Sequence, residues 1–163
     1  MYQIFKNIDK QKQFETEGFV QTSLLSSNSI QELENLYMSY INKSDDLANS
    51  RYGMHISLSD TDEQPKVELI QKVQAILKKD LDVVFENYKV HLGGFLTKLQ
   101  DDTSYTYPHQ DWTFVDNNDT EAFSSTIWIS LNDLNINSGS LGFIKGSHKL
   151  LVLHRRQLIL LPK

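Results

Sequence analysis

The stretch Tyr107-Pro108-His109-Gln110-Asp111-Trp112 determines how the rest of this chain is interpreted. It lies in a segment, Tyr105–Thr113, that we predict to be a β-strand, and residues two apart on a strand point to the same face. His109 and Asp111 are therefore expected to present an imidazole and a carboxylate side by side. These are two of the three ligands in the 2-His-1-carboxylate facial triad of non-haem Fe(II) sites. The tripeptide alone also fits a surface turn with a hydrogen-bonded His, so the sequence around it has to decide.

The second half of the chain, which contains this motif, alternates as β-structure does. Four segments are predicted strands: Tyr88–Leu99, Tyr105–Thr113, Phe123–Leu131 and Ser140–Ile144. Gly93 and Gly94 in the first strand predict a bulge or a close backbone approach. In the third strand, Thr126, Trp128 and Ser130 are expected on one face, with apolar residues on the other.

The first half of the chain has mainly helical patterns. A helix capped by Asp9 is predicted to end at Gly18, a residue suited to a left-handed C-terminal position. The stretch Ser29-Ile30-Gln31-Glu32 is a capping box that predicts the start of a helix ending near Asn42. Pro65 fits the first turn of a further helix, because a helix leaves its first amides without partners in any case.

Helices followed by antiparallel strands predict an α+β fold. We expect N-terminal helices packed on a partial double-stranded β-helix, a jelly-roll or cupin-like sheet that has eight strands when complete. The length of 163 residues fits a single domain over 1–163, with a helical part over 1–87 and a partial jelly-roll part over 88–163.

Composition restricts the partners and the chemistry. The net charge is −5, with no basic stripe, which argues against nucleic-acid binding. There are no cysteines, so any metal must be held by His, Asp or Glu. No secretory signal and no apolar run long enough to span a bilayer is visible, which makes a cytoplasmic location without membrane partners the default expectation.

Several segments, taken together and in order, resemble the phytanoyl-CoA dioxygenase family of Fe(II)- and 2-oxoglutarate-dependent oxygenases. The matching segments are Phe14–Val20, Ile30–Tyr40, Tyr107–Asp111, Thr126–Asp133, Ser138–Ile144 and Gly146-Ser147-His148. They span roughly residues 12 to 149, and their combination is far more specific than any one of them. The resemblance implies an oxidoreductase of the dioxygenase type with a cupin-like fold, and Fe(II) and 2-oxoglutarate as cofactor and cosubstrate.

The resemblance also implies roles for individual residues. His109 and Asp111 match the metal-binding pair. Gln110 and Trp128 match positions that line the 2-oxoglutarate pocket in relatives, and Lys98 matches a further cosubstrate contact. Lys98 fits a solvated strand residue equally well, and Trp128 also fits plain core packing.

Two expected parts of the family site are not found in this sequence. The distal His ligand and the following Arg or Lys that anchors 2-oxoglutarate come later in the family, and this chain ends at Lys163. His148 belongs to a Gly-Ser-His turn that is structural in relatives, and the surroundings of His154 do not match the distal strand. His55 and His91 are expected to be structural or surface residues. We therefore expect a chain truncated relative to the family.

Three hypotheses follow. The first is an oxygenase, acting in intact relatives on a small organic substrate. The second is an inactive truncated remnant or binding module of the same fold, because two ligands hold Fe(II) more weakly than three. The third is completion of the site by a second copy, in a homodimer formed through unpaired strand edges. The sequence leaves open which of them applies, and so whether this chain is an active enzyme.

Overall fold

The computed structural model describes residues 3–41, 53–98, 106–111, 124–135, 138–150 and 159–162. These residues form two compact units. The first unit contains 3–23, 84–88 and everything described from 106 onward, and the second contains 24–83 and 89–98. Each unit takes segments from both the predicted helical part and the predicted strand part, and the single-domain prediction stays a prediction.

The second unit contains two helices, α2 (Ser27–Ile41) and α3 (Glu63–Val84). The carboxylate of Asp80, near the end of α3, binds the residue before the start of α2. The Ser26 hydroxyl accepts the Ser29 amide at 3.2 Å, while Asp80 Oδ2 accepts the Ser26 amide at 3.0 Å. Helix α2 therefore begins two residues before the predicted capping box, and the cap is Ser26. The predicted helix at Pro65 is confirmed as α3.

The buried apolar side chains of this unit lie on those two helices. They are Leu33 on α2 and Leu69, Val73 and Leu81 on α3. On α3 these residues lie four and eight positions apart, which is helical spacing and places them on one face of the helix.

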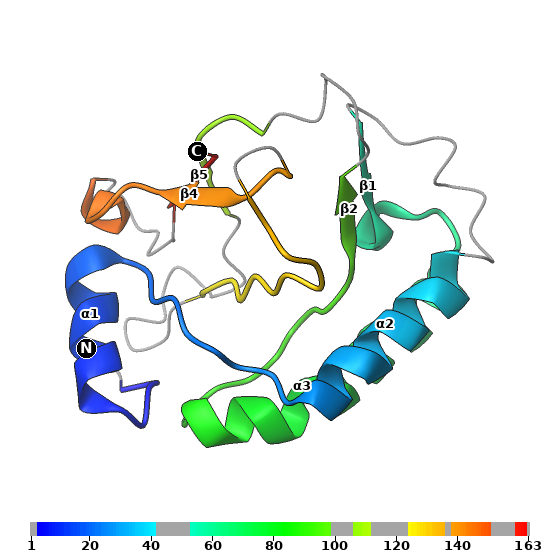
Figure 1. Cartoon of the computed structure of the whole chain (residues 1–163), viewed down its shortest axis with the longest axis horizontal. Coiled ribbons are helices and arrows are strands. Elements are labelled where there is room, and N and C mark those ends of the chain that lie inside the picture. Colours follow the sequence, from blue (N-terminus) through cyan, green and yellow to red (C-terminus); the bar gives the residue numbers. More distant parts are fainter. Residues whose placement is uncertain are drawn as a thin grey trace. The chain divides into compact units, whose positions relative to one another are not determined.

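A short antiparallel ladder completes the second unit (Figure 1). Strand β1 (Met54–Ile56) pairs with β2 (Leu96–Lys98), so that His55 lies opposite Thr97. The predicted strand Tyr88–Leu99 is thus much shorter in the described residues, because its first part finds no strand to pair with.

The predicted close approach at Gly93 and Gly94 is confirmed. A Cβ at Gly93 would lie 2.8 Å from Val73 Cγ1, and a Cβ at Gly94 would lie 2.7 Å from Ser57 Oγ. Both positions leave no room for a side chain, since real Cβ contacts are essentially never that short. The backbone at Gly93 and Gly94 therefore lies directly against α3 and against the 3-10 turn Ser57–Ser59.

A buried polar network lies beside this ladder. His55 is 4% exposed and its Nε2 lies 2.7 Å from Asp60 Oδ1, with Asp60 itself 7% exposed. Tyr40 donates its hydroxyl to the second carboxylate oxygen, and Lys66 Nζ donates to the Asp60 carbonyl at 3.2 Å. Both oxygens of the buried carboxylate are satisfied, as burial of such a group requires. His55 is therefore a structural residue of this unit.

In the first unit, helix α1 (Ile8–Glu17) begins and ends with local caps. Asn7 Oδ1 accepts the amides of Asp9 and Lys10, both at 3.0 Å, so the cap lies two residues before the predicted Asp9. Gly18 has φ 87° and donates its amide to the Phe14 carbonyl. The predicted left-handed end of this helix is confirmed.

The N-terminal stretch before α1 is held by the residues that follow α3. Lys6 N donates to the Val84 carbonyl at 3.0 Å, and Glu86 N donates to the Ile4 carbonyl at 2.8 Å. Between these two bonds, the ring of Phe5 packs on the ring of Phe85, with centroids 4.9 Å apart. This contact closes an apolar cluster around Phe5, which is 5% exposed.

In the described residues, the sheet of the first unit has three strands, and its central strand comes last in the sequence. Strand β3 (His109–Gln110) and strand β4 (Leu141–Phe143) both pair antiparallel with β5 (Ile159–Pro162). Residues 124–130 carry no strand, so the predicted strand Phe123–Leu131 is wrong over its described part. The fold is thus a mixture of helices and small sheets, and the jelly roll stays a prediction.

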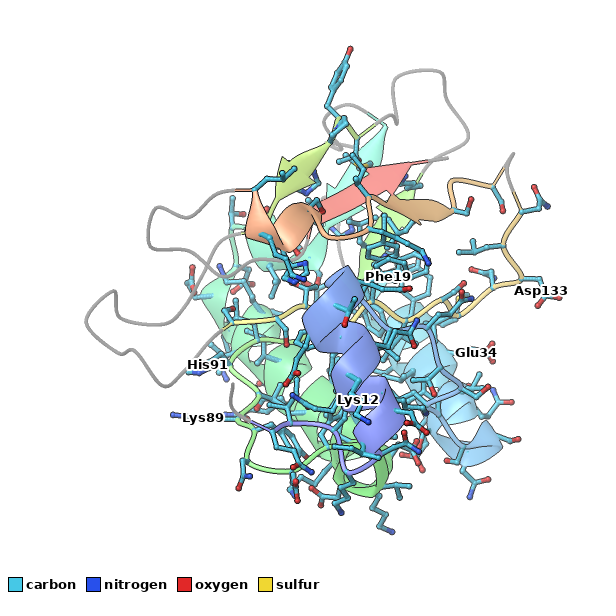
Figure 2. The ribbon with its side chains drawn as sticks, turned by 90° about the vertical axis from the view of Figure 1, so that its left-hand side faces the viewer. Lys12, Phe19, Glu34, Lys89, His91 and Asp133 are labelled. Carbon is cyan, nitrogen blue, oxygen red and sulfur yellow. The ribbon has the colours of Figure 1, made fainter. Side chains whose placement is uncertain are left out.

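The Gly-Ser-His segment fastens the end of α1. Gly146 N donates to the Glu17 carbonyl at 2.8 Å, His148 Nε2 donates to the Glu15 carbonyl at 3.2 Å, and Lys145 pairs with the Glu17 carboxylate at 2.7 Å. Just beyond this helix end, the ring of Phe19 stacks on Phe143 of β4 (Figure 2). Two segments far apart in sequence are thereby held together.

None of the helices in the described part of the chain is long and apolar enough to cross a membrane.

Candidate metal centre

The His-x-Asp motif forms the pair of side chains that its spacing predicts. His109 lies on β3 opposite Leu160 of β5, and Asp111 follows directly after the strand. His109 Nε2 is 3.4 Å from Asp111 Oδ1. The side chains are 43% and 27% exposed, respectively, so neither is enclosed in a core.

The backbone of the same segment orients the His109 ring. His109 Nδ1 lies 2.8 Å from the Tyr107 carbonyl oxygen. A carbonyl can only accept, so Nδ1 carries the hydrogen, and in the neutral ring the lone pair is on Nε2. Metal-binding histidines are held in this way, with the second ring nitrogen donating to a carbonyl or carboxylate.

Asp111 is held from a different segment. Thr126 Oγ1 lies 2.5 Å from Asp111 Oδ2 and donates its hydrogen to it. The two oxygens of the carboxylate thus face different partners, Oδ1 toward His109 and Oδ2 toward Thr126. The sequence placed Thr126 on a face with Trp128 but assigned it no role. The signal was its position two residues before that predicted cosubstrate residue.

A neutral imidazole nitrogen and a carboxylate oxygen that face each other both offer lone pairs. Such a pair requires a shared proton or a cation between the two atoms. For bonds of about 2.1 Å to one metal ion, neighbouring ligand atoms lie about 3.0–3.4 Å apart. The 3.4 Å between Nε2 and Oδ1 therefore fits two ligands of one ion, and the donor set of one imidazole and one carboxylate fits Fe(II).

A third protein ligand is not found near this pair in the described ranges. No three His, Asp or Glu side chains there lie close enough together to hold a metal ion. His148 donates to the Glu15 carbonyl at the end of α1, in line with the predicted structural role. His154 lies outside the described residues.

The predicted cosubstrate residues are distributed over three segments. Trp128 is 39% exposed on the segment that also carries Thr126, and so it is not a core residue. Lys98 is half-buried on β2 of the second unit, opposite Met54. The backbone of Gln110 lies on β3, and its side chain is outside the described part. Their cosubstrate roles stay predictions.

The family model for phytanoyl-CoA dioxygenase matches residues 27–159. This match covers more than half of the chain, so the chain belongs to a family of oxygenase-type proteins. It is a member of the phytanoyl-CoA dioxygenase family. The predicted family is confirmed by this match. Members of this family typically use Fe(II) and 2-oxoglutarate, and a cupin-like fold is suggested by membership. Neither the curated proteins nor the solved structures contain a significant match to the chain.

Proposed function

We propose that this protein is an Fe(II)- and 2-oxoglutarate-dependent oxygenase that hydroxylates a small organic molecule. The single observation that supports this most directly is the arrangement of His109 Nε2 and Asp111 Oδ1, 3.4 Å apart on partly exposed side chains, in a chain of this family. When bound, iron and 2-oxoglutarate supply the oxidising power needed to attack an unactivated C–H bond.

The residues of the chain then hold and shield the reactants. His109 offers Nε2 because the Tyr107 carbonyl takes the hydrogen on Nδ1. Asp111 contributes one negative charge and one oxygen facing His109. Trp128 would supply a flat apolar wall for the cosubstrate, and the Gln110 amide would bind one of its carboxylate oxygens.

The proposal is tested by anaerobic titration of the protein with Fe(II) and 2-oxoglutarate, following the visible metal-to-ligand charge-transfer band. A saturable band that disappears in Asp111→Ala supports the proposal. The matched control is Asp133→Ala, an exposed Asp on the segment 124–135 (Figure 2), in which the band is expected to persist. Succinate formation from 2-oxoglutarate in air then measures turnover.

A second candidate function is favoured by one observation. In the described ranges, the metal pair has no third His, Asp or Glu close to it. A module that binds a ligand without oxidising anything would give no charge-transfer band even at high Fe(II) and 2-oxoglutarate.

If the band forms, the molecular mass in solution with and without Fe(II) tests whether a second copy of the chain supplies a third ligand.

A further inference from the structure

The carboxylate of Asp111 is held unsymmetrically, and this asymmetry has a consequence for metal binding. Oδ2 lies 2.5 Å from Thr126 Oγ1, while Oδ1 lies 3.4 Å from His109 Nε2. A carboxylate oxygen can only accept, so the hydroxyl hydrogen of Thr126 points at Oδ2. Hydrogen bonds of an O–H group to an ionised oxygen at this distance are short and roughly twice as strong as neutral ones.

We propose that Thr126 is a positioning residue that reserves Asp111 Oδ2 for its own hydroxyl and leaves Oδ1 as the metal-binding atom. This inference rests on the proposed function. A carboxylate that binds through both oxygens fills two positions on the ion. A carboxylate restricted to Oδ1 fills one position, so one more position on the ion stays open for cosubstrate or O2.

Two properties of Thr126, its branched side chain and its place in the sequence, suit it to hold the Asp111 carboxylate in one orientation. Thr is β-branched, so few χ1 rotamers are available to it and its hydroxyl loses little freedom on binding Asp111. The same segment carries Trp128 two residues later, at the position predicted to line the cosubstrate pocket. The hydrogen bond therefore ties the metal ligand to the segment that is proposed to shield the cosubstrate, across 15 residues of sequence.

The test compares Thr126→Val, which keeps the shape and loses the hydroxyl, with Thr126→Ser, which keeps the hydroxyl. Thr126 is exposed, so both variants are expected to fold, and urea unfolding verifies this. Ser125→Ala, at the exposed neighbouring position, is the matched control. Affinity is measured for Co(II) alone by calorimetry, at constant pH and without cosubstrate, so that turnover plays no part.

Removal of a group that supports a metal ligand typically weakens metal binding 10–100-fold. We expect Thr126→Val to weaken Co(II) binding about 10-fold or more, with Thr126→Ser and Ser125→Ala close to the unmodified protein. Rescue by Ser is the result that a merely structural role of the side chain would not produce. Equal Co(II) affinity of Thr126→Val and the unmodified protein overturns the inference, and so does a Ser variant as weak as the Val variant.

The same titrations separate this inference from the proposed function. If the unmodified protein binds Co(II) and Asp111→Ala does not, the metal site stands, and the Thr126 variants alone decide the inference. If the unmodified protein does not bind Co(II), or if Asp111→Ala binds Co(II) as tightly as the unmodified protein does, the proposed metal site is wrong and the inference fails with it.

Discussion

Replacing Gly18 by Ala tests the junction between α1 and the Gly-Ser-His segment. Gly18 has φ +87°, a conformation that costs an L-residue roughly 1–2 kcal/mol. The new Cβ would also lie 2.3 Å from His148 Nδ1, so the ring has to move and lose its hydrogen bond to the Glu15 carbonyl. That bond contributes about 1 kcal/mol. The free energy of unfolding is therefore expected to fall by about 2–3 kcal/mol.

The matched control is Gly146→Ala in the same unit. Gly146 has a similar φ of +74°, but a Cβ there meets nothing within 4 Å. Its substitution is expected to cost only the backbone part, about 1–2 kcal/mol. Urea unfolding at neutral pH measures both variants, and a difference of about 1 kcal/mol between them is the contribution of the His148 contact.

A double-mutant cycle of Gly18→Ala with His148→Ala isolates that contact. Without the ring, Ala at position 18 no longer displaces anything, so the double mutant should be about 1 kcal/mol more stable than the sum of the single effects implies. Strict additivity, or equal costs for Gly18→Ala and Gly146→Ala, would refute the reasoning, because His148 would then not lie against Gly18.

Two further predictions concern the second unit. His55→Ala removes the ring nitrogen that lies 2.7 Å from Oδ1 of the buried Asp60 carboxylate and should lower the free energy of unfolding by about 3–5 kcal/mol. A loss below about 1 kcal/mol in urea unfolding would contradict a buried contact between these two side chains. The Ser29 hydroxyl and the Ser26 amide lower the pKa of Asp80, so its stabilising effect is present above the ordinary carboxyl pKa and is lost as pH falls through the lowered one. Asp80→Asn should therefore lose less stability between pH 6 and pH 3 than the unmodified protein, and identical pH profiles would rule this out.

Helix ends were predictable to within a turn because their signals are local, but the capping residues were not. Asp9 and Asn7 both have a side-chain oxygen that can accept amides two or three residues later, and the structure uses Asn7. Ser29 was predicted as the cap of α2, whereas Ser26 is used. The choice of Ser26 depends on Asp80, which lies 54 residues away, and no local pattern contains that information.

Strands were predictable in part: the predicted segments Tyr88–Leu99, Tyr105–Thr113 and Ser140–Ile144 each contain a short paired strand, and Phe123–Leu131 contains none over its described part. Alternating side chains over Phe123–Leu131 indicate an extended backbone, and residues 124–130 nevertheless join no sheet. A strand exists only where a partner is present, and partners are set by tertiary structure. The apolar stretch Ile159–Pro162 illustrates the converse, since it forms the central strand between β3 and β4.

The candidate site divides in the same way. The juxtaposition of His109 and Asp111 was predicted from strand geometry, and the side chains do face each other, although β3 ends at Gln110 and Asp111 follows it. Thr126 was missed as a partner of Asp111 because the two residues lie 15 positions apart in the sequence, and no local pattern predicts a contact over that separation. The available signal was that Thr126 lies two positions before Trp128, which predicts that both lie on one face of a strand. This spacing does not predict what that face contacts.

The way in which the chain alternates between its two units limits how the protein can be dissected. The chain leaves one unit for the other after Ser23, after Val83, after Tyr88 and again between Lys98 and Thr106. Neither unit is therefore a contiguous piece that could be cloned, exchanged with a relative or recombined alone. A crossover anywhere between residues 24 and 105 divides both units between the two parent proteins, so chimaeras with other family members should be joined outside this stretch.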